Sequence, residues 1–434
     1  MKILVIGSGG REHAIVWALK KTARCELTIY CAPGNAGIAK VARVVSIPVS
    51  DHEGLLSFAK AEAIDLTFVG PEAPLVAGLV DEFESAGLSI VGPSAAASRL
   101  EGSKVFAKDF MLRHKIPTAA YHTATTPQEA VQYLSGTEFG SPQSPVVVKA
   151  DGLAAGKGVI VARNHAEAES AINALMIDHV AGKEAADRII LEEALEGIEA
   201  SLLLFADGRD YVLMPAARDH KRIGDGDTGP NTGGMGTITD SSVLRHEQLM
   251  QVVDEIVVPT LQGASEEGFP FKGVLFLGLM LTDKGPKLLE YNVRFGDPET
   301  QAILVRLDTD LLAIFEAIRQ GTLGKMKVDW AQGASACVVA ANRGYPGKYE
   351  SGAVISGCEA AEGEGVQIFH AGTSFSPTGE LLATGGRVLG LTAAAKTLES
   401  ALAACYSSLA KLHWSGMQFR RDIGKTKPAL GTTC

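Results

Sequence analysis

The sequence has 434 residues, about three times the length of a typical domain, so roughly three compact units can each bury a core. Hydrophobic residues make up 46% and charged residues 21%, and no apolar run reaches the about 18 residues of a membrane span, which predicts a soluble protein without a membrane partner. The formal net charge of −10 argues against nucleic acid as a partner, because nucleic acids are bound through clustered Lys and Arg.

The beginning of the chain and its cysteines predict a cytoplasmic location. The apolar part of "MKILVIGSGG" is too short for a signal peptide and runs into glycines that suit a strand-to-helix turn. The six cysteines form neither a C-x-x-C pair nor the spacing of a zinc site, so neither a metal knot nor a disulfide framework is expected. Reduced thiols in the cytosol fit this pattern best.

The first hundred residues alternate short apolar runs with helical patterns. The predicted strands, most of them ending at Gly or Pro, are "KILVIG", "LTIYCAPG", "VVSIPV", "DLTFVGPE" and "LSIVGPS". Helices are predicted between several of them, around 11–22, 51–62, 75–87 and 94–100. This rhythm predicts an α/β fold with a doubly wound parallel sheet, whose ligands gather at the carboxyl ends of the strands.

The rest of the chain mixes extended runs with fewer helices. Helices are predicted at 103–114, 127–134, 165–179, 246–268 and 393–412. Predicted strands include "RIILEEALEG", "KLLEYNVRFGDPET", "ASACVVAAN" and "GGRVLGLT", and a polar loop is expected at 218–240. Because neither repeats nor long low-complexity linkers separate these parts, we expect the units to pack against each other.

The turn "VIGSGGREHA" after the first strand predicts an anion site and not a dinucleotide site. The G-x-G-x-x-G pattern begins at Gly7 and Gly9 but has Glu12 in place of the third small residue, which disfavours NAD. Free amides at this helix start, with Arg11 beside them, suit a single phosphate, and a tight turn without a ligand is the alternative. A second glycine turn, "CAPGNAG" at 31–37, follows another strand of the predicted sheet and strengthens the phosphate interpretation.

Two further polar stretches are candidates for contacts with a small ligand. Glu72 stands between two prolines at a third strand end, a rigid place for a carboxylate, although a plain Pro-bounded turn is as consistent. The segment "RDHKRIGDGDTGPNTGGMG" at 218–236 is a long polar loop, and such loops are usually functional or disordered. Its Asp219, Lys221 and Arg222 are placed for a charged small substrate.

The stretch "VVVKADGLAAGKGVIV" at 146–161 predicts a phosphate-binding turn between two strands. It is not a P-loop, because only three residues separate Gly152 from Gly156 and Lys157 is followed by glycine. Lys149 ends one strand and Lys157 lies in the turn, so both ammonium groups can point at phosphate oxygens.

Other side chains are weaker candidates for a nucleotide site. Lys104 in "EGSKVFAKDF" can reach a phosphate, although a lysine on a helix surface is the usual case. The stretch "ILEEALEGIEAS" combines a strand end with Glu192, Glu193 and Glu199. These residues can offer backbone groups to an adenine and a carboxylate to ribose hydroxyls, and acidic decoration of the surface is the alternative.

The strand "KLLEYNVRFGDPET" predicts a metal site. Alternate residues of a strand share a face, so Glu290 and Asn292 should project together while Leu289 and Tyr291 face the other way. Two oxygen ligands suit Mg²⁺ that bridges nucleotide phosphates, because this ion keeps waters and takes only one or two protein carboxylates. Arg294 continues the alternation and can neutralise charge on a transferred phosphoryl group. The alternative is an edge strand with a polar face.

Taken in order along the chain, these stretches resemble the phosphoribosylamine-glycine ligase family, also called glycinamide ribonucleotide synthetase, of the ATP-grasp superfamily. The resemblance runs from about residue 1 to 425 and is most specific at 218–236 and 290–301. It implies an N-terminal Rossmann-like domain at 1–102, an ATP-grasp domain at 103–325 with a mobile lid at about 121–195, and a C-terminal α/β domain at 326–434.

The resemblance also implies a role for individual residues. ATP would lie between lid and central sheet, in contact with Lys104, Lys149, Gly152, Gly156, Lys157, Glu192, Glu193 and Glu199. Glu290 and Asn292 would hold Mg²⁺ or Mn²⁺, and Arg294 would meet the transferred phosphoryl group. The seat of the phosphoribosyl end would involve Gly9, Gly10, Arg11, Glu12 and Asn35. Asp219 would lie near the amine or glycine, and Lys221 and Asp297 would bind substrate.

The reaction that this implies is the ATP-dependent ligation of glycine to phosphoribosylamine through glycyl phosphate, by a protein expected to be a monomer. Another ATP-grasp ligase joining a different acid and amine is the nearest alternative. A further alternative is a nicotinamide-dependent oxidoreductase built on the first domain, which Glu12 disfavours. Another is a non-catalytic nucleotide sensor, which the strand at Glu290 disfavours.

Overall fold

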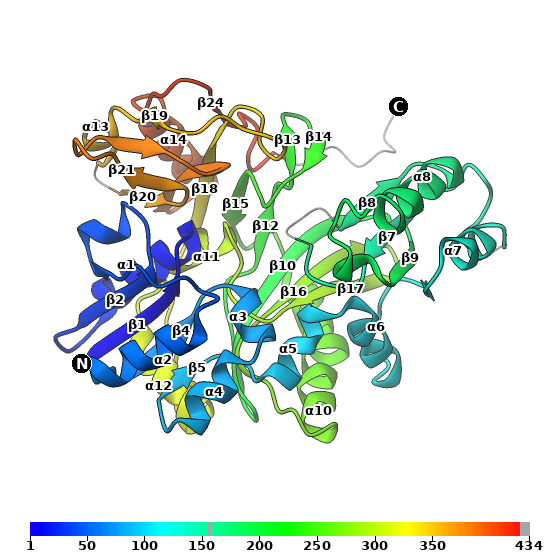
Figure 1. Cartoon of the computed structure of the whole chain (residues 1–434), viewed down its shortest axis with the longest axis horizontal. Coiled ribbons are helices and arrows are strands. Elements are labelled where there is room, and N and C mark those ends of the chain that lie inside the picture. Colours follow the sequence, from blue (N-terminus) through cyan, green and yellow to red (C-terminus); the bar gives the residue numbers. More distant parts are fainter. Residues whose placement is uncertain (137, 155–157, 364, 426–434) are drawn as a thin grey trace.

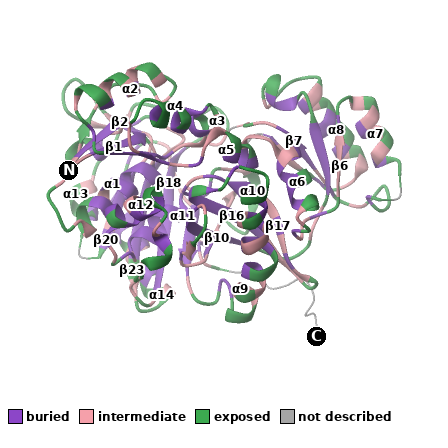
Figure 2. Cartoon of the chain, turned by 90° about the horizontal axis from the view of Figure 1, so that it is seen from below, coloured by how far each residue is buried: buried purple, intermediate pink, exposed green. Residues whose placement is uncertain are grey.

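A computed structural model describes residues 1–136, 138–154, 158–363 and 365–425 of the chain. The N-terminal unit and the unit made by β6–β9 lie on opposite sides of a large central sheet, and the C-terminal elements lie above the N-terminal unit (Figure 1). Buried residues follow β1 and the strands of the central sheet, such as β10, β16 and β18 (Figure 2). Within the described ranges, no helix is long and apolar enough to cross a membrane.

The N-terminal unit is built on a parallel sheet in the order β3-β2-β1-β4-β5. Its strands are β1 (Lys2–Gly7), β2 (Thr28–Pro33), β3 (Arg43–Val44), β4 (Leu66–Val69) and β5 (Ile90–Val91). Its helices are α1 (Gly10–Thr22), η1 (Ile38–Lys40), α2 (His52–Ala61), α3 (Glu72–Val76), α4 (Leu79–Ser85) and α5 (Ala95–Gly102). Ile3, Leu4, Val5 and Ile6 are all fully buried, as expected of a parallel strand that is covered on both faces. The predicted α/β fold class is confirmed.

The next unit is a small antiparallel sheet in the order β6-β9-β7-β8, reached through helix α6 (Lys104–Arg113). Its elements are β6 (Tyr121–Ala124), α7 (Pro127–Leu134), β7 (Val146–Ala150), β8 (Val159–Ala162), α8 (His165–Met176), η2 (Glu184–Ala186) and β9 (Ile189–Glu193). Val146, Val148 and Leu191 of the sheet pack with Ile172 of α8 in a separate hydrophobic core. The unit therefore buries apolar surface by itself.

The central sheet continues into the C-terminal part of the chain, in the order β17-β16-β10-β12-β15-β18-β23-β20. Its strands are β10 (Ile198–Asp207), β12 (Ala217–Asp219), β15 (Gly236–Thr239), β16 (Lys272–Thr282), β17 (Gly285–Asn292), β18 (Ala334–Asn342), β20 (Val366–His370) and β23 (Arg387–Ala395), with β11 (Tyr211–Leu213) and β24 (Met417–Gln418) paired alongside. Because β15 pairs with β18, strands from the central and C-terminal regions share one hydrogen-bonded ladder.

The remaining elements cover this sheet or lie at its edges. The helices are α9 (His246–Val252), the π-helical turn η3 (Val253–Val257), α10 (Val258–Glu266), α11 (Glu299–Leu304), α12 (Leu311–Gln320), η4 (Leu323–Lys325), α13 (Cys358–Ala361) and α14 (Leu398–Leu409). The small sheets are the hairpin β13 (Arg222–Gly224) and β14 (Thr228–Asn231), and the set β19 (Ala353–Val354), β22 (Leu381–Ala383) and β21 (Thr373–Phe375).

Several predicted elements differ from the observed ones for local reasons. The helix predicted at 75–87 is interrupted by Gly78, which has φ of +91° and separates α3 from α4. The strand predicted for "VVSIPV" pairs only over Arg43–Val44. The polar loop predicted at 218–240 contains two strands of the central sheet and a hairpin. The helix predicted near 393–412 begins only at Leu398, because the preceding residues pair in β23.

Candidate active site

The first turn of the N-terminal unit is closed by protein carboxylates. Gly7 has φ of +132°, and a Cβ there would collide with the side chain of Glu12. The Glu12 carboxylate folds back over the helix start and accepts a hydrogen bond from the Gly9 N–H at 2.6 Å. Asp297 Oδ2 accepts from the Arg11 N–H at 3.4 Å. The expectation of free amides at this turn is therefore wrong for Gly9 and Arg11, because side-chain oxygens already bind them.

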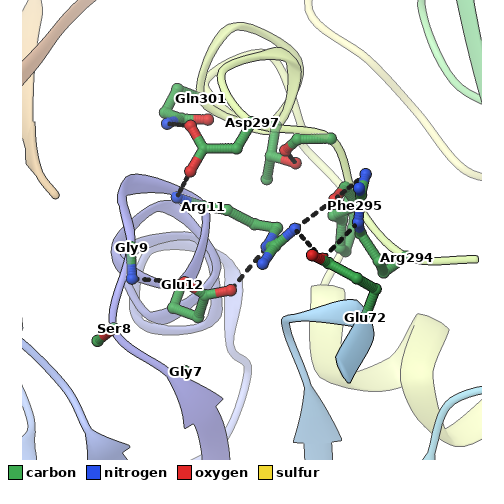
Figure 3. A network of polar contacts seen from close by, with 12 residues as sticks. Gly7, Ser8, Gly9, Arg11, Glu12, Glu72, Arg294, Phe295, Asp297 and Gln301 are labelled. Carbon is green, nitrogen blue, oxygen red and sulfur yellow. Dashed lines mark hydrogen bonds and ion pairs between the residues drawn. The ribbon is translucent and has the colours of Figure 1, made fainter. Parts of the chain in front are cut away.

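The Arg11 side chain is buried and points toward the end of β17 (Figure 3). Its Nε donates to Glu12 Oε1 at 2.6 Å and its Nη1 donates to the Phe295 carbonyl at 3.0 Å. Glu72 Oε2 lies 4.0 Å from the same Nη1. Burial opposes the charge, but the carboxylates of Glu12 and Glu72 outweigh it and raise the pKa of Arg11. Arg11 thus stays positively charged beside the helix start.

Arg294 completes a polar network that joins the N-terminal unit to the chain after β17 (Figure 3). Its Nε donates to Glu72 Oε2 at 3.2 Å, and its Nη2 donates to Glu101 Oε1 at 2.7 Å. Burial works to raise the pKa of Glu72, but Arg294 and Arg11 outweigh burial and hold that pKa below its ordinary value. The residue predicted to meet the phosphoryl group is therefore oriented by two carboxylates of the N-terminal unit.

Gly10 and Asn35, both predicted for the phosphoribosyl seat, lie at contacts between units. The Asn35 amide nitrogen donates to the carbonyls of Ser8 and His370, each at 2.8 Å, so it links the N-terminal turn to β20. A Cβ on Gly10 would press against the side chain of Gln301 in α11. Both residues therefore shape the turn by allowing or making close packing.

Strand β17, for which the sequence predicts a metal site, contains a bulge that the alternating pattern did not predict. Gly278 of β16 pairs with Glu290, whereas the next residue of β16 pairs with Leu288, so Leu289 is the extra residue. Leu288 and Tyr291 are buried in the core, and Leu289 lines a cavity together with Lys221 and other polar residues. The prediction that Leu289 faces away from the site is wrong, because the bulge turns its side chain to the site face.

Four basic side chains from separate segments act on the charge of Glu290. Burial works to raise the pKa of Glu290, but Lys221 and Lys149, with Lys104 and Arg294, outweigh burial and lower it. The structure thus brings together residues that the sequence placed in different motifs, and Glu290 is held as a carboxylate among cations. Such a cluster can bind the phosphates of a nucleotide.

Asn292, at the end of β17, fits the predicted metal site. Its side chain is 9% exposed, and its Nδ2 has no hydrogen-bond partner among the described residues. The amide is therefore not committed to a structural role. One carboxylate and one amide oxygen are hard ligands of the kind that Mg²⁺ takes alongside phosphate oxygens and waters. The residues present at Glu290 and Asn292 fit such an ion.

Lys149 of β7 shares one buried carboxylate with a lysine that sequence reasoning missed. Glu192 Oε2 lies 2.9 Å from Lys149 Nζ and 3.2 Å from Lys108 Nζ. Lys149 Nζ also lies 3.5 Å from the Leu289 carbonyl, so the sheet of β6–β9 and strand β17 face the same site. Burial lowers the pKa of Lys108 to about 8. The signal for Lys108 was its position on the apolar face of the helix predicted at 103–114.

Lys104 begins helix α6 and contacts the loop after β7. Its N–H donates to the Asp151 carbonyl at 3.0 Å, and its Nζ lies 3.4 Å from the Gly152 carbonyl. Burial lowers the pKa of Lys104, although Glu290 acts against this. A Cβ on Gly152 would lie 3.0 Å from the backbone of Ala185, so the chain passes closely there. The predicted contacts of Gly156 and Lys157 lie outside the described residues.

The acidic residues at the end of β9 and the start of β10 have different surroundings. Glu192 is 2% exposed, and its Oε1 has no hydrogen-bond partner within the described part of the chain. Glu193 is exposed and lies 3.7 Å from Lys287 Nζ. Glu199 Oε2 pairs with Lys221 Nζ at 3.0 Å, and this contact raises the pKa of Lys221. Only Glu192 is thus enclosed in the site, while Glu193 and Glu199 lie at its border.

Asp219, which lines the cavity, and the buried Glu299 are neighbouring carboxylates. Burial and the proximity of Glu299 raise the pKa of Asp219 well above its ordinary value, and burial raises the pKa of Glu299. Arg387 of β23, which sequence reasoning missed, donates to the carbonyls of Gly233 and Asp297 and lies 3.4 Å from Asp297 Oδ1. The C-terminal region therefore supplies a cation to this site. An arginine within the apolar run "GGRVLGLT" was the available signal.

Comparison with known protein families identifies all three regions of the chain. Residues 1–101 match the phosphoribosylglycinamide synthetase N domain, residues 102–300 its ATP-grasp (A) domain, and residues 335–426 its C domain. The chain is 46% identical over 424 residues to a phosphoribosylamine–glycine ligase of Agrobacterium fabrum, with 98% of each chain covered. It is 48% identical over 427 residues to that of Xanthomonas axonopodis pv. citri, with 98% of this chain and 97% of the relative covered.

Solved structures have the same architecture. The crystal structure of phosphoribosylamine–glycine ligase from Thermotoga maritima matches with a TM-score of 0.82 and 35% identity, covering 97% of this chain and all of that chain. The biotin carboxylase domain of the Hydrogenobacter thermophilus 2-oxoglutarate carboxylase, in complex with MgADP, matches with a TM-score of 0.70 and 18% identity over 96% of this chain and 91% of that one. At that identity the second likeness is one of fold alone.

Proposed function

This chain belongs to the phosphoribosylglycinamide synthetase family, and we propose how its residues carry out the reaction of that family, the ATP-dependent ligation of glycine to phosphoribosylamine. The protein is an ATP-dependent carbon–nitrogen ligase of purine biosynthesis. The two curated relatives described above, which match 98% of the chain, are both phosphoribosylamine–glycine ligases.

The triphosphate of ATP is proposed to lie between β7 and β17. Lys149 Nζ lies 3.5 Å from the Leu289 carbonyl, next to Glu290, and both Lys149 and Lys104 lower the pKa of Glu290. A triphosphate that enters there would replace the Glu192 carboxylate as the partner of Lys149 and the Gly152 carbonyl as the partner of Lys104. Gly152, with Gly156 and Lys157 as predicted from the sequence, would let the loop after β7 approach the phosphates closely.

The base and the ribose are proposed to lie along the chain after β9. Glu192 Oε1, which has no hydrogen-bond partner among the residues that the structure describes, and the backbone near Glu193 would face the adenine, and Glu199 would meet the ribose hydroxyls. Glu290 and Asn292 would hold Mg²⁺ or Mn²⁺, which when bound neutralises charge between the nucleotide phosphates.

Glycine is proposed to be activated by phosphorylation. Its carboxylate oxygen attacks the γ-phosphorus, the bond between that phosphorus and the bridging oxygen of ADP breaks, and glycyl phosphate forms. Arg294 would stabilise the charge on the phosphoryl oxygens, because its guanidinium is already fixed by Glu72 and Glu101. The carboxylates of Asp219 and Glu299 would bind an ammonium group of a substrate, since a cation offsets the repulsion between them.

The second step is proposed to join the two substrates without a side-chain nucleophile. The amine nitrogen of phosphoribosylamine attacks the carbonyl carbon of glycyl phosphate, the carbon–oxygen bond to phosphate breaks, and the nitrogen loses a proton. The turn at Gly9, Gly10 and Arg11 would hold the phosphoribosyl end, with Asn35 and Glu12 shaping the turn and Lys221 and Asp297 lining the path to glycine. The enzyme contributes orientation and charge neutralisation.

The approach of Lys149 Nζ to the Leu289 carbonyl at 3.5 Å, next to Glu290, carries this proposal, and the effect of Lys104, Lys149, Lys221 and Arg294 on the pKa of Glu290 supports it. The experiment that tests it measures ADP release with glycine and phosphoribosylamine present together and each omitted in turn. We expect ADP only when both substrates are present, and steady ADP release without glycine would contradict the assignment. The monomeric state and the cytoplasmic location stay predictions from the sequence.

A further inference from the structure

Glu101 occupies a position where a carboxylate is costly. It lies in the last turn of α5, where the helix end carries partial negative charge, and it is 9% exposed. Burial raises the pKa of Glu101, and the nearby Glu72 acts in the same direction. A buried acid at a helix C-terminus needs strong partners, so the contacts that offset this cost indicate what the residue does.

The partners of Glu101 are two consecutive residues just beyond strand β17. Its Oε2 accepts a hydrogen bond from the Val293 N–H and its Oε1 accepts from Arg294 Nη2, both at 2.7 Å. The ladder between β16 and β17 ends with the pair Phe276 and Asn292. Glu101 therefore fixes the backbone at the point where sheet pairing stops, and it orients the next side chain with the same carboxylate.

The turn that contains Glu101 also fixes the phosphate side of the site. Lys104 follows three residues later, and its N–H donates to the Asp151 carbonyl. Ser103 Oγ donates to Asp151 Oδ1 at 2.8 Å, which ties the same turn to the loop after β7. One short connection between α5 and α6 thus contacts both the strand that carries Asn292 and the loop that follows Lys149.

We propose that Glu101 is a positioning residue that sets Asn292 and Arg294 in register with Lys104 across the nucleotide site. This rests on the roles proposed above for those three residues. Glu101 itself has no place among the groups that touch substrate. It acts through the Val293 amide and the Arg294 guanidinium, so its loss should affect the chemical step and the metal-linked binding of nucleotide more than the fold.

The test compares Glu101→Gln with Glu101→Asp and with a matched control, Glu267→Gln. Glu267 also pairs with an arginine, Arg113, but at the opposite end of α6. The glutamine keeps the size of Glu101 and loses its charge, and the aspartate keeps the charge but is too short to bind both partners. For each protein kcat and KM are measured, together with the dissociation constant of ADP by calorimetry in Mg²⁺ and in EDTA.

We expect kcat of Glu101→Gln to fall about 10-fold or more, because a misplacement of about 1 Å can cost about 10²-fold. KM for ATP and the affinity for ADP in EDTA should stay within about threefold of wild type, and the gain in ADP affinity on adding Mg²⁺ should shrink. Glu101→Asp should lie between Glu101→Gln and wild type, and Glu267→Gln should match wild type.

A kcat within about threefold of wild type in Glu101→Gln would overturn the proposal. Loss of ADP binding in EDTA would also overturn it, since Glu101 would then support the fold and not the register. If Mg²⁺ did not increase the ADP affinity of wild type, the metal role of Glu290 and Asn292 would be refuted instead. The kcat of Glu101→Gln would then decide the role of Glu101. If wild type released no ADP with both substrates present, the proposed function would fail. The role of Glu101 would then be decided by calorimetry alone, from the ADP affinities of Glu101→Gln and wild type in Mg²⁺ and in EDTA.

Discussion

Replacing Lys149 by methionine should separate catalysis from stability. Lys149 and Lys108 both contact Glu192 Oε2, at 2.9 Å and 3.2 Å, and all three side chains are buried. Two positive charges therefore share one negative charge. Removing Lys149 leaves Lys108 and Glu192 as a matched pair, and methionine fills much of the space of the lysine stem.

The magnitudes of the two effects should differ widely. Breaking a buried ion pair and leaving one charge alone costs about 3–5 kcal/mol, but Lys149→Met leaves no such charge, so we expect a change in unfolding free energy within about 1 kcal/mol. The same substitution removes a cation from the proposed phosphate site, which should lower kcat/KM about 10²-fold to 10³-fold. Glu192→Gln is the contrasting variant, because it removes the only carboxylate within ion-pair distance of these two buried lysines among the described residues, and it should lose about 3–5 kcal/mol.

The assays are urea unfolding for the free energy and ADP release for kcat/KM, on wild type, Lys149→Met and Glu192→Gln. A Lys149→Met protein with kcat/KM within about threefold of wild type would refute the assignment of Lys149 to the phosphates. A loss of stability in Lys149→Met as large as that in Glu192→Gln would refute the charge reasoning, since Lys108 would then not be compensating.

Three further predictions concern charge at other places in the molecule. Arg294→Ala should lower kcat about 10²-fold or more in the ADP assay, and a loss of about threefold or less would contradict its role at the phosphoryl group. Burial lowers the pKa of His13 to about 3 and of His370 to about 4, below the ordinary 6.5, so the unfolded chain binds protons that the folded chain does not. The contribution of the neutral histidines to the free energy of unfolding should be complete above about pH 6.5 and should fall toward pH 4, by about 2 kcal/mol per histidine at pH 5. As the pH is lowered, the urea midpoint should fall less in His370→Asn than in wild type. Equal falls in the two proteins would contradict this prediction. EDTA should abolish ADP release and Mg²⁺ or Mn²⁺ should restore it, whereas full activity in EDTA would refute a metal at Glu290 and Asn292.

Local signals made much of the N-terminal unit predictable from the sequence. The glycine turn after β1 and the helix over Gly10–Thr22 follow from residues that are neighbours in the chain. The length of the strand predicted for "VVSIPV" does not follow from local sequence, because pairing beyond Val44 depends on how far β2 extends beside it. In the same way, the pairing of β15 with β18 joins residues about a hundred positions apart, and no local pattern encodes it.

The active site was partly predictable for the same reason. Glu290 and Asn292 stand out as polar residues in an apolar strand, but the bulge at Leu289 depends on Gly278 of the partner strand, where a Cβ would lie 3.1 Å from Glu290 Cγ. Glu101 was not predictable as a site residue, and Lys108 was marked only by its place on the apolar face of a predicted helix. An acid near a helix end and a lysine in a helix are usually exposed, and their meaning comes from the elements that cover them.

The central claim is that glycine is activated by transfer of the γ-phosphoryl group to its carboxylate, in the site formed by Lys149, Glu290 and Arg294. Glycine labelled with ¹⁸O in its carboxylate tests this most directly, by mass spectrometry of the inorganic phosphate that the reaction releases. The mechanism predicts one labelled oxygen in each phosphate, because the attacking oxygen leaves with the phosphorus. Unlabelled phosphate formed alongside glycinamide ribonucleotide would contradict it.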